Sequence, residues 1–194
     1  MRRKFNEMTD KKAIEAILLG SRIGRLATLG QDGYPYITPV NYVYRRGAIY
    51  FHCALQGEKL DNLQRDPKVC FAVDRPLAYL DGGFDAKMAV CDVSQYYQSV
   101  VIRGRAELIV DIAEKVEALN ALMASHENVP EFNAITVSTP AVARCAVVVV
   151  RIESLSAKAN LAQKKSAADK EKICAYLQQR GLPGDKEAAE LIGE

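Results

Sequence analysis

Three short β-type segments follow one another between residues 23 and 53, with a tight turn after each of the first two. Ile23 to Leu29 is followed by Gly30-Gln31-Asp32-Gly33, and Tyr34 to Tyr44 is followed by Arg45-Arg46-Gly47, which leads into Ala48 to Cys53. Connections this short join only antiparallel strands. The chain therefore begins with a three-stranded meander, and this order disfavours the alternation of strands and helices that builds a parallel sheet.

The middle strand is expected to present two different faces, because successive side chains of a strand point to opposite sides. One face carries Tyr34, Tyr36, Thr38, Val40, Tyr42 and Tyr44, and the other carries Pro35, Ile37, Pro39, Asn41 and Val43. Proline has no N–H group to donate to a sheet. We therefore expect a free edge or an interruption near Pro35 and Pro39.

Further elements surround this meander. Strands are predicted at residues 68–73, 99–110 and 142–152, and helices at residues 10–19, 58–65 and from Asp111 to about Ser125. Thr9 is the expected cap of the first helix, and Asp111 with Glu114 forms a capping-box-like start of the third. The polar stretch 74–95 predicts a long loop. Six strands, joined as hairpins and covered by helices, predict a mainly β fold with α-helices (α+β), arranged as a closed or nearly closed barrel.

The composition changes after Ser154. Lysine occurs five times between residues 158 and 172, at positions 158, 164, 165, 170 and 172. This pattern predicts an exposed tail with a helix over about residues 168–180, which Gly181 ends. We therefore expect a barrel domain at residues 1–153 and a lysine-rich helical C-terminal extension at residues 154–194.

Charge and residue usage exclude several classes of function. A net charge of +2 over 194 residues makes nucleic-acid binding unlikely. No apolar run approaches the roughly 18 residues that a membrane span needs, and Glu15 interrupts the early apolar stretch, so we expect a cytoplasmic protein. Five cysteines without a Cys-x-x-Cys pair indicate reduced thiols, and two histidines make a protein-held metal improbable.

The segment around residue 57 has the parts of a phosphate site. The start of a helix presents unpaired N–H groups and a partial positive charge. Gly57 lets the backbone come close to a ligand, Lys59 adds a cation, and Asn62 lies on the same helix face as a further hydrogen-bond donor. The same pattern is also typical of a helix that merely begins in solvent.

His52 also has two interpretations. It could be a hydrogen-bonded barrel histidine, or it could donate a proton or anchor a carboxylate or nitro group of a substrate. The cysteines fit small buried side chains better than nucleophiles. Ser99 has no evident His and Asp partners, so serine hydrolysis lacks its triad.

Several runs together resemble a known family. These runs are Gly33 to Tyr44, Gly47 to Ala54, Lys59 to Leu63, Asp66 to Cys70 and Ser99 to Glu107. In this order they are similar to the pyridoxamine-5'-phosphate-oxidase-like FMN-binding split barrels, and most similar to the branch that contains the nitroimidazole-resistance proteins. The resemblance covers roughly residues 8–153 and implies a six-stranded antiparallel split β-barrel with covering helices.

The resemblance also implies a homodimer with FMN at the subunit interface. It places the flavin ring and ribityl chain along Thr38, Pro39, Val40, Asn41 and Tyr42. His52 and Cys53 would then flank the cofactor, Lys59 would hold its phosphate and Ser99 would contact it across the dimer. The oxidases themselves carry basic residues where this chain has Thr38, Val43 and Glu58, and their motif for gripping pyridoxal phosphate is not evident, so we do not expect vitamin B6 oxidation.

The sequence thus predicts an FMN-dependent oxidoreductase that takes electrons from NAD(P)H and passes them to a small acceptor such as a nitroaromatic compound. His52 is the expected proton source. The alternative is a non-catalytic flavin- or haem-binding protein, with His52 or His126 as the axial ligand of a haem. A weaker possibility is a regulator whose basic termini contact nucleic acid.

Overall fold

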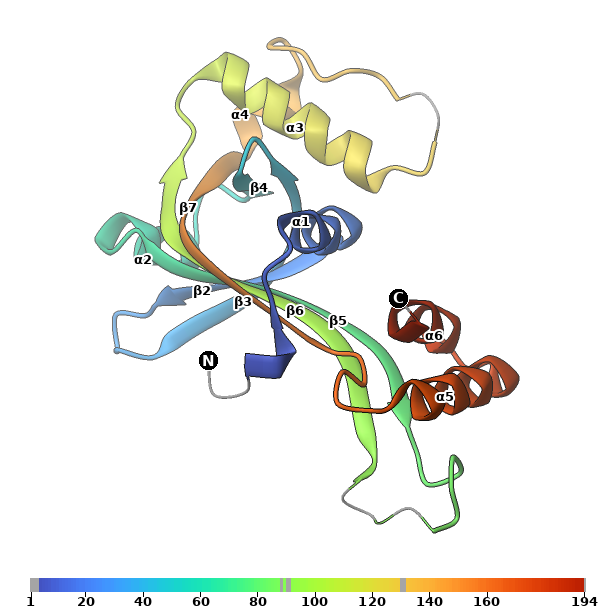
Figure 1. The fold of residues 1–194 in the computed structure, drawn as a ribbon. Coiled ribbons are helices and arrows are strands. Elements are labelled where there is room, and N and C mark those ends of the chain that lie inside the picture. Colours follow the sequence, from blue (N-terminus) through green and yellow to red (C-terminus); the bar gives the residue numbers. More distant parts are fainter. Residues whose placement is uncertain (1–3, 88, 90–91, 130–131, 194) are drawn as a thin grey trace. The chain divides into compact units, whose positions relative to one another are not determined.

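The structure is a computed structural model that describes residues 4–87, 89, 92–129 and 132–193. The chain forms two compact units (Figure 1). The first unit comprises Met1–Ile17, Asp74–Val100 and Ser156–Glu194. The second unit comprises Leu18–Val73 and Val101–Leu155. The expected division at residue 153 stays a prediction, and strand β7 (Ala146–Asn160) continues across that position.

The strands form one sheet that closes on itself. They are β1 (Glu7–Met8), β2 (Ile23–Leu29), β3 (Pro35–Arg45), β4 (Ala48–Cys53), β5 (Lys68–Leu80), β6 (Ser94–Leu108) and β7. Their order is β1-β7-β4-β3-β2-β5-β6, and an additional pairing of β7 with β6 joins the last six into a ring. This arrangement confirms the six-stranded antiparallel split barrel.

Strand β3 has the free edge that its prolines require. It pairs with β2 from Pro35 to Asn41, whereas its register with β4 begins only at Tyr42, opposite Phe51. Pro35 and Pro39 thus lie on the part of β3 that is paired on one side. The expected alternation is present as well, because Val40 and Tyr42 are buried and Ile37 is exposed.

The barrel interior of the second unit is filled by large side chains, among them Tyr42, Phe51 and Phe71. The rings of Tyr42 and Phe71 meet edge to face with centroids 5.1 Å apart. Gly24 makes room for this pair, because a Cβ atom there would lie 2.0 Å from the Phe71 ring. The hydroxyl of Tyr42 donates to the carbonyl oxygen of Leu18 at 2.8 Å, and burial raises its pKa.

Helices cover the strands at several places. They are the short 3-10 helix η1 (Lys4–Asn6) and the α-helices α1 (Lys11–Gly20), α2 (Glu58–Arg65), α3 (Ile112–His126), α4 (Pro140–Arg144), α5 (Ala167–Arg180) and α6 (Asp185–Gly193). Helix α3 lies against the outer face of β4 and β7 (Figure 1), where Leu119 and Leu122 pack on Tyr50 and Val149. Asp111 caps this helix, since its side chain accepts from the N–H of Glu114 at 2.7 Å, as predicted.

Several predicted boundaries were wrong. The stretch 74–95 is not a loop throughout, because β5 continues to Leu80 and β6 already begins at Ser94. The sequence Asp74-Arg75-Pro76 has the composition of a turn, but the residues after it are buried against α5 and α6. Strand β7 begins at Ala146 and not at Val142, since Pro140 starts the short helix α4. The side chain of Asp10, and not that of Thr9, caps α1 by accepting from the N–H of Lys12.

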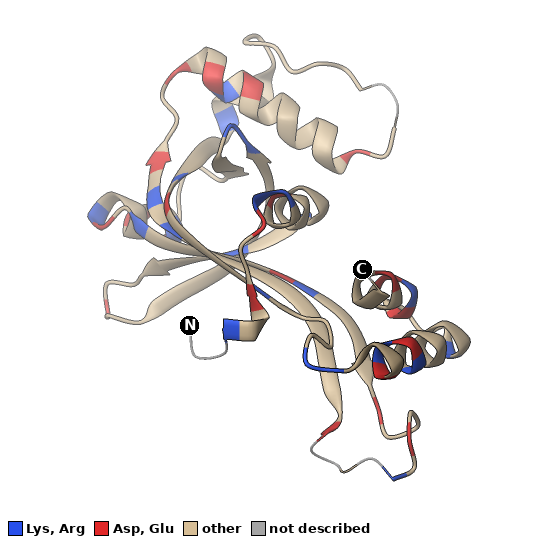
Figure 2. Cartoon of the chain, viewed as in Figure 1, with Lys and Arg blue, Asp and Glu red and all other residues tan. Residues whose placement is uncertain are grey.

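The C-terminal helices are packed and are not an exposed tail. Ile173 and Leu177 of α5 and Ile192 of α6 are buried together with Leu77 and Tyr96. Gly181 ends α5 in a left-handed conformation with φ 65°, as predicted. Basic and acidic residues are interspersed along both helices (Figure 2). The expected helix is therefore present, but its apolar side completes a hydrophobic core.

A buried ion pair fastens these two helices. Arg180 donates to both oxygens of Asp185, at 2.9 and 2.6 Å, and to Asp81 at 2.6 Å. The side chain of Asp185 is 1% exposed, and it also accepts from the N–H of Leu182. The hydrogen bonds from Arg180 hold the pKa of Asp185 below its usual value, in spite of the opposing effect of burial.

The substitution Arg180→Gln should lower the free energy of unfolding by about 3 kcal/mol, because it leaves the buried Asp185 carboxylate without its cation. A carboxylate with a lowered pKa stabilises the fold at neutral pH and loses this effect as the pH falls below about 4. The difference between the wild-type chain and the variant should therefore shrink in acid. Urea unfolding at several pH values measures it.

Arg151→Gln is the control. Arg151 pairs with Glu107 and Glu114, and all three side chains are partly exposed, so its loss should cost less than about 1 kcal/mol. Equal losses for the two variants, or a loss for Arg180→Gln that is independent of pH, would contradict the role assigned to the buried pair.

Candidate functional site

A pocket of about 170 Å³ lies where β4 leads into α2. Its lining consists of Tyr36, Cys53, Ala54, Gln56, Gly57, Glu58, Lys59 and Leu60. We call it the α2 pocket. Gly57 caps the helix with φ 131°, a backbone conformation that other residues rarely adopt, and no atom lies within 4 Å of where its Cβ would be. The backbone at the start of α2 is therefore open to a ligand.

Lys59 is the cation of this pocket. Its ammonium group lies 5.8 Å from the centre of the buried Phe51 ring, which places the charge beside the end of β4. The first backbone hydrogen bonds within α2 are made by the N–H groups of Leu60 and Asp61 to Gly57, so earlier N–H groups have no partner inside the helix. Glu58 also lines the pocket, and its exposed carboxylate opposes the charge of Lys59.

Cys53 lies in the same pocket, but its environment favours the thiol. Burial raises its pKa, the nearby Lys59 lowers it by a smaller amount, and Cys145 raises it further. Since the thiolate is the nucleophilic form, this shift argues against a nucleophilic role. Cys53 is thus a packing residue at the wall of the α2 pocket.

The predicted flavin-contacting run of β3 divides between two faces. Val40 and Tyr42 are buried inside the barrel, whereas Pro39 and Asn41 are exposed on its outer face. The hydroxyl oxygen of Thr38 is buried and has no hydrogen-bond partner among the described residues. Thr38 therefore offers an unsatisfied polar group, and the side chain of Tyr42 is committed to the core.

Two other predicted cofactor contacts, Asn62 and Ser99, are not part of the α2 pocket. Asn62 is 2% exposed, donates to the hydroxyl of Thr28 at 3.1 Å and accepts from Arg65 at 3.1 Å. Its amide thus joins α2 to β2. Ser99 lies in β6 and belongs to the first unit, whereas the residues that line the α2 pocket belong to the second.

A second pocket, of about 500 Å³, lies between the outer face of the barrel and α3. We call it the α3 pocket. It is lined by Asn41, His52, Leu119, Leu122, Met123, His126, Glu127, Ile135, Ala141, Arg144 and Cys145. Because Tyr42 and Phe51 are paired and point inward, Asn41 and His52 point outward beside each other.

The α3 pocket brings together both histidines of the chain. His52 is exposed on β4, and His126 ends α3 with its Nε2 atom 2.9 Å from the carbonyl oxygen of Tyr42. The sequence named His126 only as a possible axial ligand of a haem. Its place in the same pocket as His52 depends on how α3 packs on β4, and residues 74 positions apart carry no local pattern that would show it.

These features define an antiparallel split barrel with a cationic pocket at the start of a helix and an apolar pocket containing two histidines. The family model for pyridoxamine 5'-phosphate oxidase matches residues 10–159. The chain belongs to this family, which is a flavin-binding family. No curated protein matches the sequence.

Solved structures show the same fold. A proposed 5-nitroimidazole antibiotic resistance protein from Bacteroides thetaiotaomicron is 26% identical with a TM-score of 0.68, over 79% of this chain and 86% of that one. An FAD- and haem-binding protein from Mycobacterium smegmatis is 18% identical with a TM-score of 0.69, over 88% and 80%. An FAD-binding protein from Mesorhizobium loti is 24% identical with a TM-score of 0.55, over 78% and 96%.

Two further kinds of feature are absent from the part of the chain that the structure describes. No helix in that part is long and apolar enough to cross a membrane. No cluster of three or more His, Cys, Asp or Glu side chains in the same part of the chain could hold a metal ion.

Asn62→Ala tests whether this side chain is structural. Because the buried amide bonds Thr28 and Arg65, its removal should lower the free energy of unfolding by about 1–3 kcal/mol. The affinity of the folded protein for FMN should be unchanged. Urea unfolding and a flavin titration measure the two quantities.

Gln64→Ala on the exposed side of the same helix is the control, and it should change the stability by less than about 0.5 kcal/mol. A normal stability of Asn62→Ala together with weaker FMN binding would instead assign Asn62 to the cofactor, as the sequence predicted.

Proposed function

We propose that this protein is an FMN-dependent oxidoreductase. In this proposal, two copies of the chain hold the flavin between them, NAD(P)H supplies electrons, and a small acceptor receives them. The observation that carries the proposal is the α2 pocket, in which Lys59 and the open backbone of Gly57 meet at a helix start, within a chain that belongs to a flavin-binding family.

The residues of the α2 pocket fit a phosphate group. Lys59 would pair with the phosphate and the first N–H groups of α2 would donate to it, because the start of a helix favours an anion. The free hydroxyl of Thr38 is an available partner for a polar part of the cofactor. A volume of about 170 Å³ holds a phosphate but not a whole flavin, so the remaining parts of the cofactor need another surface.

A second copy of the chain is our candidate for that surface. The outward face of the β2–β3 hairpin carries exposed apolar side chains, with Ile23 at 53%, Leu29 at 44% and Ile37 at 60% exposure. Leu29 and Ile37 lie close together in this face, because Leu29 is opposite Pro35 and Ala27 is opposite Ile37, and neighbouring exposed apolar side chains are typical of an interaction site. We therefore propose a homodimer in which this face is covered by the partner subunit.

The flavin, when bound, supplies two-electron transfer. The chain's own residues hold the cofactor and supply a proton. Conversion of a nitro group to a nitroso group and water consumes two electrons and two protons, and a hydride carries only one of these protons. His52 is exposed on β4, lines the α3 pocket and would deliver the second proton to the acceptor.

A nitroaromatic acceptor is supported by one comparison. The proposed 5-nitroimidazole antibiotic resistance protein shares 26% of its residues with this chain and matches it over most of both lengths. We propose nitroaromatic compounds as one class of acceptor on this basis.

A haem-binding protein is the second candidate, because both histidines line the α3 pocket. Nε2 of His126 is engaged with the main chain, which leaves His52 as the axial ligand in this alternative. An absorption spectrum of the purified protein separates the two candidates, since a flavin and a haem have different bands. Haem bands that disappear in His52→Ala would support the alternative.

Lys59→Ala should weaken the binding of FMN about tenfold or more, because it removes the cation that pairs with the phosphate. The affinity for riboflavin, which has no phosphate, should stay the same. Flavin fluorescence titrations of both ligands measure the effect. Lys68→Ala removes an exposed lysine outside the pocket and is the control; an equal loss for both ligands would argue against a phosphate site at Lys59.

Ile37→Asp should separate the dimer into monomers, since it places a charge on the proposed interface. FMN affinity should fall with the loss of the partner. Light scattering and flavin titration measure both, and Val137→Asp, at a residue that is 66% exposed outside this face, is the control. A wild-type chain that is a monomer and still binds FMN would refute the interface.

His52→Gln should slow the reduction of a nitroaromatic acceptor about a hundredfold, because glutamine cannot deliver the proton. The reduction of bound flavin by NAD(P)H should keep its rate. Stopped-flow measurement of the two half-reactions separates these effects, and an unchanged acceptor step would remove His52 from the reaction.

A further inference from the structure

We propose that the α3 pocket binds a small aromatic carboxylate and that Arg144 holds the carboxylate group. The use of this pocket for a substrate rests on the proposed function, whereas the binding of the anion does not.

The size and the walls of the pocket fit an aromatic ring. A volume of about 500 Å³ lies within the range of small-molecule sites. Leu119, Leu122, Met123 and Ile135 form an apolar side, and the first two belong to the hydrophobic cluster beneath α3. Such walls bind a flat apolar body by removing it from water.

The loop after α3 is tied down where it contributes to this wall. The side-chain amide of Asn120 donates to the carbonyl oxygen of Ile135 at 2.8 Å, and the N–H of Ile135 donates back to Asn120 at 2.8 Å. Ile135 is therefore held in place by two reciprocal bonds. A rigid wall lowers the cost of ordering that binding would otherwise incur.

Arg144 supplies the charge that the apolar walls lack. It is the last residue of α4, it is exposed, and no carboxylate among the described residues pairs with it. Glu127 is the one acidic residue in the pocket lining and is itself exposed to solvent. A guanidinium group matches a carboxylate with two parallel hydrogen bonds, so Arg144 favours this anion over a neutral group.

Polar side chains of β3 and β4 also line the α3 pocket, and one of them is the proposed proton donor. His52 and Asn41 line the α3 pocket, and both are also predicted contacts of the flavin. A ligand anchored at Arg144 would therefore lie against the histidine that we propose as the proton source. In this reading Arg144 determines specificity and does not take part in proton or electron transfer.

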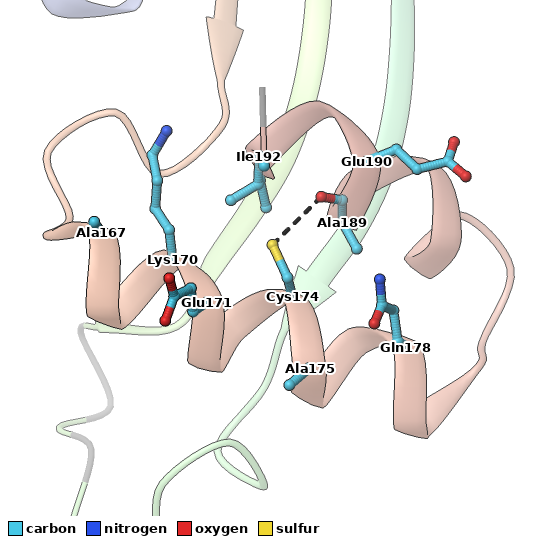
Figure 3. A pocket seen from close by; sticks show the side chains of 10 residues that line it. Ala167, Lys170, Glu171, Cys174, Ala175, Gln178, Ala189, Glu190 and Ile192 are labelled. Atoms are coloured by element: carbon cyan, nitrogen blue, oxygen red, sulfur yellow. Dashed lines mark hydrogen bonds between the residues drawn. The ribbon is translucent and has the colours of Figure 1, made fainter.

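The groove between α5 and α6 offers no comparable binding site. It contains Cys174, whose thiol donates to the carbonyl oxygen of Ala189 at 3.3 Å, with Lys170, Glu171, Gln178 and Glu190 around it (Figure 3). Burial raises the pKa of this thiol. The thiol is thus bonded within the unit, and the mixed charges at the rim select no ligand.

The test uses naphthoate and its neutral analogue naphthamide as probes, with the full-length chain in flavin-free and FMN-loaded form. Because the chain has no tryptophan, naphthalene fluorescence can be followed directly. Naphthoate should bind about tenfold more tightly than naphthamide. Arg144→Gln should abolish this difference by weakening naphthoate alone, and Arg144→Lys should retain part of it.

Two further variants serve as references. Arg103→Gln removes an exposed arginine of β6 outside the pocket and should change neither affinity. Met123→Ser should weaken both probes equally, because it removes apolar wall and no charge. Equal affinities of the two probes for the wild-type chain, or an unchanged naphthoate affinity in Arg144→Gln, would overturn the proposal.

The acceptor reaction tests the substrate role. With nitrobenzoate and nitrobenzamide as acceptors, Arg144→Gln should raise the KM for nitrobenzoate about tenfold, while its kcat and both constants for nitrobenzamide stay unchanged. A chain that binds naphthoate through Arg144 but never binds a flavin would refute the proposed function and support the anion site. A flavin-loaded chain that binds neither probe would refute the anion site and support the proposed function.

Discussion

The pairing of β3 with β4 controls where every candidate side chain can act. Tyr42 and Phe51 are opposite each other and fill the barrel interior, so their neighbours Asn41 and His52 must face outward. A shift of this register by one residue would bury His52 and expose Phe51. The edge-to-face contact of Tyr42 with Phe71 and the bond of its hydroxyl to Leu18 hold the Tyr42 face of β3 toward the barrel interior, so Asn41 stays on the outer face.

The same register separates two kinds of environment at β4. Cys53 ends the strand beside Lys59, where an anion is favoured, and His52 faces an apolar pocket under α3. Adjacent residues of one strand thus contribute to two different pockets. The phosphate site and the proton donor that we propose thus involve neighbouring residues of β4, without a long loop between them.

The sequence predicted local elements well and their distant contacts poorly. The limits of β2, β4 and α2 are correct because Gly30, Gly33, Gly47 and Asp66-Pro67 mark their ends within the chain itself. The strand from Asp74 to Leu80 was missed because Asp-Arg-Pro has the composition of a turn, and only its packing on α5 and α6 keeps it extended. Asn62 shows the same limit, since helical spacing placed it beside Lys59 but could not show that Thr28 and Arg65 occupy its amide.

The sequence could not predict that Arg144 and His126 line the same pocket. His126 ends a fifteen-residue helix and Arg144 ends a five-residue one, so both were consistent with ordinary helix ends. The packing of α3 on Tyr50 and Val149 brings their pocket together, and two reciprocal hydrogen bonds with Asn120 hold Ile135 in its wall. The specificity of the α3 pocket therefore depends on the hydrophobic contacts of α3 and not on any motif, so relatives with the same strands but a different helix here should select different ligands.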